Sequence, residues 1–362
     1  MAHADESSPA IPRRAALSRL GAAAVAIATP VSLAPRAKPS RKNRRDDEFE
    51  TLLKLASVPS FSMAMVDGQR ISTRAVGLRR AGETERVTPD TVYAAASLTK
   101  AVFSYVLLGL VNEKVLSLDT PIREYLPLPN PDDPRAPAIT ARRLLSHSGG
   151  WRNWRNNSTQ PLTSDFDPGT KWSYSGEGFF FLQRVAEKLT GKGMSQLARE
   201  RVFEPLGMGA RGVPLDAVKT EDSELAIKVA EPSLPVLPNY LVPIAAASML
   251  TSAADFGVFM RHLVTARQQG GQPAAIVEMM MTPQIRCNDA IQWGLGVGLE
   301  ALGGHRYAWQ WGDNQGFKHI FLADPQQEKA IVVFTNGDRG ARVYERVIRA
   351  LTGDDHPAFL WA

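Results

Sequence analysis

The stretch DTVYAAASLTK, residues 90–100 of the 362-residue chain, decides the fold. It ends in the chain's one Ser-x-x-Lys motif, formed by Ser97 and Lys100, and leads into an apolar helix pattern over Leu98 to Glu113. Three residues apart on a helix, the two side chains share a face and can touch. A lysine whose pKa is lowered by burial or nearby charge can take the proton of a serine hydroxyl and make it a nucleophile. At a helix start, the serine's backbone N–H also helps to hold a developing oxyanion.

Alone, this motif is a weak indication, because average composition predicts about one chance match in a chain of this length. The alternative is a capping serine with an exposed lysine. Lys100, however, lies in an apolar run with Ala101, Val102 and Phe103. An unpaired lysine would be costly there, so the context favours the catalytic interpretation.

The segment from Asp90 to Lys100 resembles the nucleophile segment of class C β-lactamases and their relatives, the D-alanyl-D-alanine carboxypeptidases and β-lactamase-like esterases. Three further stretches match the family in the same order: Leu144–Gly150, Pro168–Ser175 and Arg201–Met208. Together with strand-like runs near the C-terminus, they cover nearly the whole of residues 50–350. The resemblance implies an α+β fold of the β-lactamase/transpeptidase type.

The resemblance also assigns Tyr174, which matches the family's catalytic tyrosine. A phenol normally titrates near ~10, and close lysine ammonium groups would lower that pKa. Tyr174 could then move a proton between the serine, the leaving group and water. Without the resemblance, it would be interpreted as a core tyrosine. His147 suggests a Ser-His pair, but in the family this histidine is structural.

Two positions depart from the family pattern. Its Tyr-x-Asn motif is Tyr174-Ser175-Gly176 here, so the amide that would contact the lysine and the substrate amide is missing. Its Lys-Thr-Gly or His-x-Gly motif corresponds to Gln310-Trp311-Gly312, or, shifted by one residue, to Trp311-Gly312-Asp313. Either way, a positive charge that would bind a substrate carboxylate is absent. A backbone N–H of this strand, that of Asp313, can still serve as the second oxyanion donor.

The remaining pattern places strands at both ends of the chain. Phe61–Val66 and Arg70–Gly77 predict a β-hairpin, and a helix is expected over Phe179–Thr190. Strand-like runs near the C-terminus precede a final helix over 341–351; they are Gln292–Glu300, Arg306–Gly312, Phe317–Ala323 and Lys329–Thr335. We therefore expect an antiparallel sheet built from N- and C-terminal strands with a helical region inserted between them. Residues 231–243 hold four prolines and predict an irregular loop.

The N-terminal residues resemble a twin-arginine export signal. Arg13-Arg14 precede a short apolar run from Gly21 to Ala28, with small residues before position 35. We expect a signal peptide at 1–34, a basic linker at 35–45 and one domain at 46–362. The protein would be periplasmic or secreted, with no stable membrane span after processing, since the apolar run is too short. The alternatives are a disordered basic tail and an uncleaved membrane anchor.

Charge distribution and cysteine and histidine content argue against nucleic-acid binding, disulfide bonds and a metal site. The net charge is +5, but residues 1–45 carry nine basic and two acidic side chains, which leaves 33 basic and 35 acidic for the rest. A nucleic-acid partner is not expected, because the positive charge is not on the folded domain. The single cysteine, Cys287, forms no intrachain disulfide. No ligand cluster surrounds His305 or His319, so we expect no metal and no cofactor.

These features favour a serine hydrolase that forms and hydrolyses an acyl-serine intermediate. Its substrates would be small esters, β-lactams or D-Ala-type peptides, with esters favoured because the two departures weaken recognition of amides and carboxylates. The alternative is a non-hydrolytic, penicillin-binding-like module that senses a cell-wall peptide or a β-lactam. The presence of Ser97, Lys100 and Tyr174 together favours the enzyme.

Overall fold

The computed structural model describes residues 41–155, 160–208 and 243–361. The predicted export signal, residues 35–40 of the predicted linker and residues 231–242 of the predicted loop lie outside the described residues. The described residues from Arg41 onward form one unit. Its first helix, α1 (Arg41–Ala56), begins inside the stretch that was predicted to be linker.

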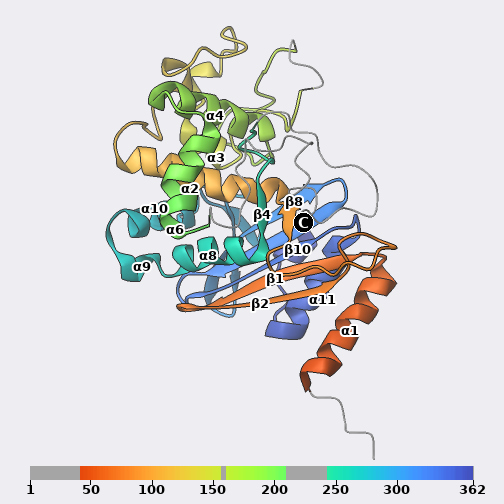
Figure 1. Ribbon diagram of the computed structural model, residues 1–362. Coiled ribbons are helices and arrows are strands. Elements are labelled where there is room, and N and C mark those ends of the chain that lie inside the picture. The colour runs from red at the N-terminus through yellow and green to blue at the C-terminus, as the bar shows by residue number, and fades with distance from the viewer. Residues whose placement is uncertain (1–40, 156–159, 209–242, 362) are drawn as a thin grey trace, which may run out of the picture. The chain divides into compact units, whose positions relative to one another are not determined.

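An eight-stranded antiparallel sheet forms the centre of this unit (Figure 1). Across the sheet the order is β2-β1-β10-β9-β8-β7-β6-β5. The strands are β1 (Ser60–Asp67), β2 (Arg70–Gly77), β5 (Ile285–Arg286), β6 (Ile291–Trp293), β7 (Gly298–Leu302), β8 (His305–Asn314), β9 (Phe317–Asp324) and β10 (Lys329–Thr335). The N-terminal hairpin joins the C-terminal strands through β1 and β10, whose register runs from Phe61 opposite Thr335 to Asp67 opposite Lys329. The predicted α+β architecture is therefore confirmed.

One predicted strand is wrong. The run Gln292–Glu300 is two strands, β6 and β7, joined by a tight turn in which the Gly294 N–H donates to Val297 O. Gly296 in this turn has a φ of 86°, a left-handed conformation that glycine adopts without strain. A Cβ at Gly294 would lie 2.1 Å from Met280 O. The two glycines therefore reverse the chain where the hydrophobic pattern continues.

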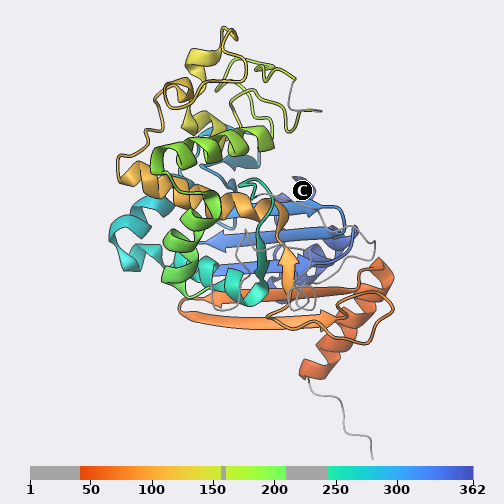
Figure 2. The same ribbon diagram turned by 45° about the horizontal axis from the view of Figure 1, so that its top comes forward.

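Apolar side chains cover both faces of the sheet, as alternation along its strands requires. On β10, Ile331 and Val333 pack with α1 and α11 (Gly340–Thr352). Val332 and Phe334 belong to a second, larger core that includes α8 (Ala253–Val264) and the inserted helices. Figure 2 shows the inserted helices gathered on the side of the sheet away from α1.

The inserted region supplies the helix that carries the Ser-x-x-Lys motif. This helix, α2 (Thr99–Asn112), is buried from Thr99 to Leu110, as its all-round apolar pattern predicts. The other α-helices of the described residues are α3 (Ala141–Leu145), α4 (Gly176–Thr190), α5 (Met194–Ala198), α6 (Glu204–Leu206), α9 (Ala266–Gln269), α10 (Gly271–Met281) and the C-terminal α12 (Ala358–Trp361). Strands β3 (Val92–Ala94) and β4 (Leu250–Ser252) form a small separate antiparallel sheet, and β3 directly precedes the turn that carries Ser97. Among the described residues, no helix combines the length and apolarity that a membrane crossing needs.

Candidate active site

Ser97 lies in a single 3-10 turn, Ala96–Leu98, that leads directly into α2. The residue before it, Ala96, has a φ of 49°, a strained conformation for a residue with a Cβ. Thr99 holds the turn in place, because its hydroxyl donates to Ala96 O and accepts from the Met249 N–H. The turn therefore fixes Ser97 at the N-terminal end of a buried helix, where its own N–H has no intrahelical partner.

Lys100 follows one turn later and is 1% exposed. Its Nζ lies 3.2 Å from Ser97 Oγ and donates a 2.7 Å hydrogen bond to the carbonyl oxygen of Ala246. The rings of Tyr174 and Phe179 enclose it, with centroids 4.7 and 5.4 Å from Nζ. Burial lowers the pKa of Lys100 from 10.5 to about 7. A large fraction of the lysine is therefore the neutral amine at neutral pH.

Tyr174 reaches the same serine from the segment that precedes α4. Its hydroxyl donates a 2.7 Å hydrogen bond to Ser97 Oγ. Burial raises the pKa of Tyr174 above its usual value, and the hydrogen bonds that the phenol makes to Ser97 and accepts from Gln310 oppose this shift only in part. The predicted lowering of the Tyr174 pKa is therefore wrong. Burial of the phenol is the largest cause, and the negative charge of Asp313 shifts its pKa in the same direction.

His147 supports Tyr174 from the other side. Its ring packs on the tyrosine ring, with centroids 4.3 Å apart, and its Nδ1 accepts a hydrogen bond from the Ser175 N–H. Burial and the nearby Lys100 hold the pKa of His147 well below its usual value. The histidine is therefore a neutral packing partner, which fits the structural role expected for it.

Strand β8 brings the remaining predicted residues to the site. Gln310 is fully buried, and its Nε2 lies 3.4 Å from Tyr174 Oη. Two residues on, a Cβ at Gly312 would lie 2.8 Å from Ala95 O, so only glycine lets the strand approach the serine turn this closely. Trp311, between them, packs on Tyr174 with ring centroids 5.0 Å apart. This geometry favours the register Gln310-Trp311-Gly312 over the one shifted by a residue.

Among the described residues, no strand pairs with β8 beyond Trp309 on its β7 side. A two-residue loop closes the β8–β9 hairpin at the pair Asn314 and Phe317. Because hydrogen-bonded and non-hydrogen-bonded pairs alternate, the N–H of Asp313 points away from β9. The register of β7 on the opposite edge ends at Trp309. The Asp313 N–H is thus directed to the same edge as Tyr174, while its carboxylate pairs with Lys318.

The chain matches the family profile described as Beta-lactamase over residues 46–353. It belongs to the β-lactamase family. One similar protein is penicillin-binding protein 4 of Amycolatopsis lactamdurans, 28% identical over 61% of this chain and 60% of the relative. Another is esterase EstB of Burkholderia gladioli, 30% identical over 39% of this chain and 43% of the relative. A D-aminopeptidase of Cereibacter sphaeroides is 22% identical over 80% of this chain and 59% of the relative.

Solved structures agree on the fold. A class C β-lactamase superposes with a TM-score of 0.73 at 17% identity, covering 87% of this chain and 97% of that one. The octameric penicillin-binding protein homologue of Pyrococcus abyssi superposes with a TM-score of 0.72 at 17% identity, covering 86% of this chain and 77% of that one. The matches span 31% to 60% of the length of the curated relatives. The named relatives include esterases and D-aminopeptidases, so this is a family of hydrolases.

Two contacts of the β-lactamase-like site were not predicted. Ala246 contributes only a carbonyl oxygen, which any residue has, so no side-chain pattern could indicate it. Trp154 lies over Gly176, and a Cβ on that glycine would be 2.2 Å from its indole ring. The missing asparagine side chain at 176 was the one available indication that another group fills this space.

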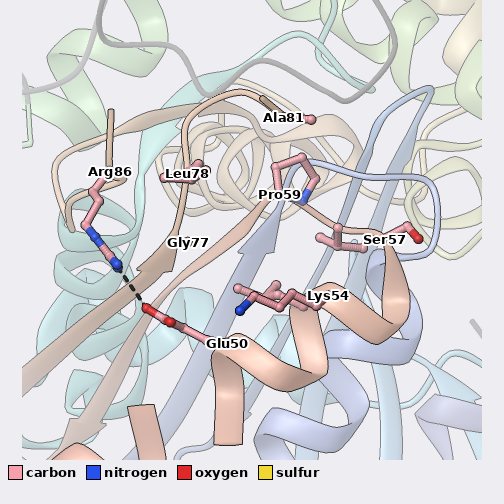
Figure 3. Close-up of a pocket in the computed structure, with 10 residues that line it drawn as sticks. Glu50, Lys54, Ser57, Pro59, Gly77, Leu78, Ala81 and Arg86 are labelled. Atoms are coloured by element: carbon pink, nitrogen blue, oxygen red, sulfur yellow. Dashed lines mark hydrogen bonds and ion pairs between the residues drawn. The ribbon is translucent and has the colours of Figure 1, made fainter. Parts of the chain in front are cut away.

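Two other features lie apart from this cluster. A cavity of about 640 Å³ is lined by residues of α1, the end of β2 and the loops beside them, including an ion pair of 3.0 Å between Glu50 and Arg86 (Figure 3). Neither Ser97 nor its partners line it. Burial raises the pKa of the Cys287 thiol to about 12, so this cysteine is not a ready nucleophile.

Proposed function

We propose that this β-lactamase-family chain is a serine hydrolase that cleaves small esters through an acyl intermediate on Ser97. One observation carries the proposal: an amine and a phenol converge on the same hydroxyl, with Lys100 Nζ at 3.2 Å and Tyr174 Oη at 2.7 Å from Ser97 Oγ. Hydroxyl nucleophiles require a base at this range. The low pKa of Lys100, about 7, supplies that base near neutral pH.

In acylation, Ser97 Oγ bonds to the carbonyl carbon of the ester, and its proton passes to Lys100 Nζ. The carbonyl oxygen becomes an oxyanion that accepts hydrogen bonds from the N–H groups of Ser97 and Asp313. When the bond to the leaving alkoxide breaks, the Tyr174 hydroxyl gives its proton to that alkoxide, while Lys100 keeps the proton of the serine. In deacylation the Tyr174 phenolate takes a proton from the attacking water, whose oxygen bonds to the acyl carbon, and Lys100 returns its proton to Ser97 Oγ as the acid departs.

Esters are the favoured class because the site lacks groups that amides and carboxylates need. Gly176 provides no amide side chain, and Gln310 provides no positive charge beside Tyr174. An amide nitrogen must be protonated as it departs, whereas an activated ester's alkoxide leaves readily. Trp311 adds an apolar surface next to Tyr174. The site therefore suits an uncharged acyl chain better than a β-lactam or a D-Ala-type peptide.

Covalent labelling tests the proposal. A fluorophosphonate should modify Ser97, and peptide mass spectrometry should find the adduct on the peptide that contains it. Ser97→Ala should remove both the adduct and the hydrolysis of p-nitrophenyl acetate, while Ser146→Ala, a serine outside the Lys100–Tyr174 pair, should keep the adduct. Labelling at Ser146 or Ser148, or none, would contradict the assignment. Labelling followed by no turnover of any ester would indicate the non-hydrolytic sensing module instead.

We also propose that this hydrolase acts outside the cytoplasm. The proposal is supported by Arg13-Arg14 and the short apolar run that follows them. No cofactor is needed for the chemistry, because the lysine, the phenol and two backbone N–H groups supply every proton transfer and contact described above.

A further inference from the structure

Trp154 occupies the space that a side chain at Gly176 would fill. A Cβ added to Gly176 would lie 2.2 Å from Cζ2 of the indole and 2.6 Å from both Cε2 and Cη2. It is therefore the six-membered part of the ring that covers the first residue of α4. Phe179, three residues further along the same helix face, packs on Lys100. The covered face of α4 is thus the one that looks towards the reacting groups.

Hydrogen bonds hold the residues on either side of Trp154 to the start of α4. The carbonyl oxygen of Asn153 accepts from the N–H groups of Gly176 and Glu177, at 3.1 and 2.9 Å. Arg155, on the other side, forms a two-point ion pair with Glu177 at 2.9 and 3.1 Å. The two side chains of this pair are only 15% and 8% exposed. The backbone on both sides of Trp154 is therefore held in a fixed position against α4.

The indole nevertheless remains 44% exposed. Among the large apolar side chains in the described part of the chain, the exposed ones are Leu55, Val115, Trp154 and Leu360. Trp154 is the aromatic member of this set, and it contacts Gly176, two residues after Tyr174 in the chain. An exposed aromatic ring held against the helix that follows Tyr174 is a surface that a ligand can cover favourably.

We propose that Trp154 is a specificity-determining residue whose indole receives the apolar acyl group of an uncharged ester, aromatic or branched. The proposal rests on the ester hydrolase function above and names its substrate class. Where the family resemblance places an asparagine amide for a substrate amide, this chain presents ring carbons, which offer no hydrogen-bond acceptor. An amide at that position would lose its partner, whereas a phenyl or branched alkyl group would gain contact.

The first test compares p-nitrophenyl phenylacetate with p-nitrophenyl acetate, which share a leaving group and differ only in the acyl group. The ratio of their kcat/KM values should fall about tenfold in Trp154→Ala, because one apolar contact in a pocket changes selectivity by roughly 10- to 200-fold. Trp154→Phe should keep most of the ratio. Leu55→Ala removes another exposed apolar side chain, on α1, and should leave the ratio unchanged.

The second test uses the close approach of the two residues. Gly176→Ala should displace the indole and lower the same ratio even though Trp154 is retained. Because both changes remove one interaction, the double variant should show little more loss than either single variant. An additive loss, or an unchanged ratio in Trp154→Ala, would overturn the proposal. A wild-type protein that hydrolyses neither ester would instead contradict the proposed function, so the two failures are distinguishable.

Discussion

Lys100 Nζ lies 3.2 Å from Ser97 Oγ and 2.7 Å from the carbonyl oxygen of Ala246. A neutral amine can satisfy both contacts, donating to the carbonyl while its lone pair accepts the serine proton. On the other side of the serine, the Tyr174 hydroxyl donates to Oγ, and Gln310 Nε2 lies within 3.4 Å of the phenol oxygen. The four side chains thus form one hydrogen-bonded chain that can move the nucleophile's proton towards the lysine.

The pH dependence of the reaction follows from the lysine in this chain. Because burial lowers the pKa of Lys100 to about 7, the fraction of free base rises with pH through that value. We expect kcat/KM for p-nitrophenyl acetate to rise from pH 5, to reach half its maximum near pH 7 and to level off above pH 8. Lys100→Arg should be inactive throughout, since a guanidinium stays protonated. A rate independent of pH between 5 and 8 would contradict the base assignment.

The same burial should cost the protein stability. Between pH 7 and 10.5, the unfolded chain holds the Lys100 proton and the folded chain does not, so stability rises with pH in this window. Below pH 7 the full penalty is present. Lys100→Met removes this penalty. The variant also leaves the Ala246 carbonyl without its hydrogen-bond donor, which costs about 1–3 kcal/mol of stability. We expect the variant to be more stable than wild type at pH 6.

Urea unfolding of both proteins across pH measures this effect. The advantage of Lys100→Met should shrink by about 2–3 kcal/mol between pH 6 and pH 9, since each pKa unit corresponds to about 1.4 kcal/mol. Lys188→Met is a matched control, because that lysine donates to a backbone carbonyl, Tyr125 O, from an exposed position. Its stability difference should not change over the same range.

Tyr174 should matter most for poor leaving groups. Burial raises its pKa, so the phenol keeps its proton over the range in which Lys100 titrates and can give it to a departing alkoxide. Tyr174→Phe should lower kcat/KM by roughly 10²–10⁴-fold for an ethyl ester, and by less for a p-nitrophenyl ester, whose leaving group needs no proton. Tyr344→Phe changes another buried tyrosine, on α11, and should spare both rates. Equal losses for the two esters would show that Tyr174 donates no proton.

Export is tested on the full chain. We expect the mature protein to be found outside the cytoplasm without its N-terminal residues, and Arg13→Lys with Arg14→Lys to retain it inside, because the twin-arginine pair is the feature that identifies the route. N-terminal sequencing of the fractionated protein measures both. An intact Met1 terminus on a cytoplasmic protein would refute the prediction. Arg36→Lys with Arg44→Lys, in the basic stretch beyond the apolar run, is the matched control.

The sequence predicted the parts of the site that depend on local geometry. Ser97 and Lys100 meet because residues three apart share a helix face, and that contact needs no tertiary information. Tyr174 is 77 residues from Ser97, and only the family resemblance brought it to the site. The direction of its pKa was mispredicted because the shift depends on how deeply the phenol is buried. Rings of His147, Trp293 and Trp311 that pack around it come from three separate segments.

Much of the fold was predictable from local sequence patterns as well, and the errors in its prediction have a common cause. Alternating and apolar runs indicated the hairpin β1–β2 and strands β8 to β10, which the sheet contains. The split between β6 and β7 depends on Gly294, where a Cβ would clash with Met280 O of α10. The seating of Trp154 on Gly176 is likewise a long-range contact. Periodicity carries no information on such approaches, because they arise only once separate elements have packed together.

Gln310 offers the most direct control over substrate class. Its side chain is fully buried and its Nε2 lies 3.4 Å from Tyr174 Oη, where the family resemblance expects a cation. Gln310→Lys would place an ammonium beside the phenol, lower the pKa of Tyr174 and offer a charge to a substrate carboxylate. A charge-assisted contact of this kind contributes about 1.5–3 kcal/mol, or roughly ten- to a hundredfold in binding. We expect the ratio of kcat/KM for a chromogenic cephalosporin to that for p-nitrophenyl acetate to rise by this factor.

Gln310→Met is the control for this prediction, because it keeps the length of the side chain without adding charge. It should lower or leave unchanged the cephalosporin-to-ester ratio, since it removes the one polar neighbour of Tyr174 on β8 that the structure pairs with the phenol. Two substrates measured on three proteins therefore separate charge from shape. A wild-type protein that already cleaves the cephalosporin faster than the ester would overturn the ester preference. A ratio that does not move in Gln310→Lys would mean that Gln310 does not face the substrate's carboxylate, and the strand register deduced from Gly312 and Ala95 would then need another basis.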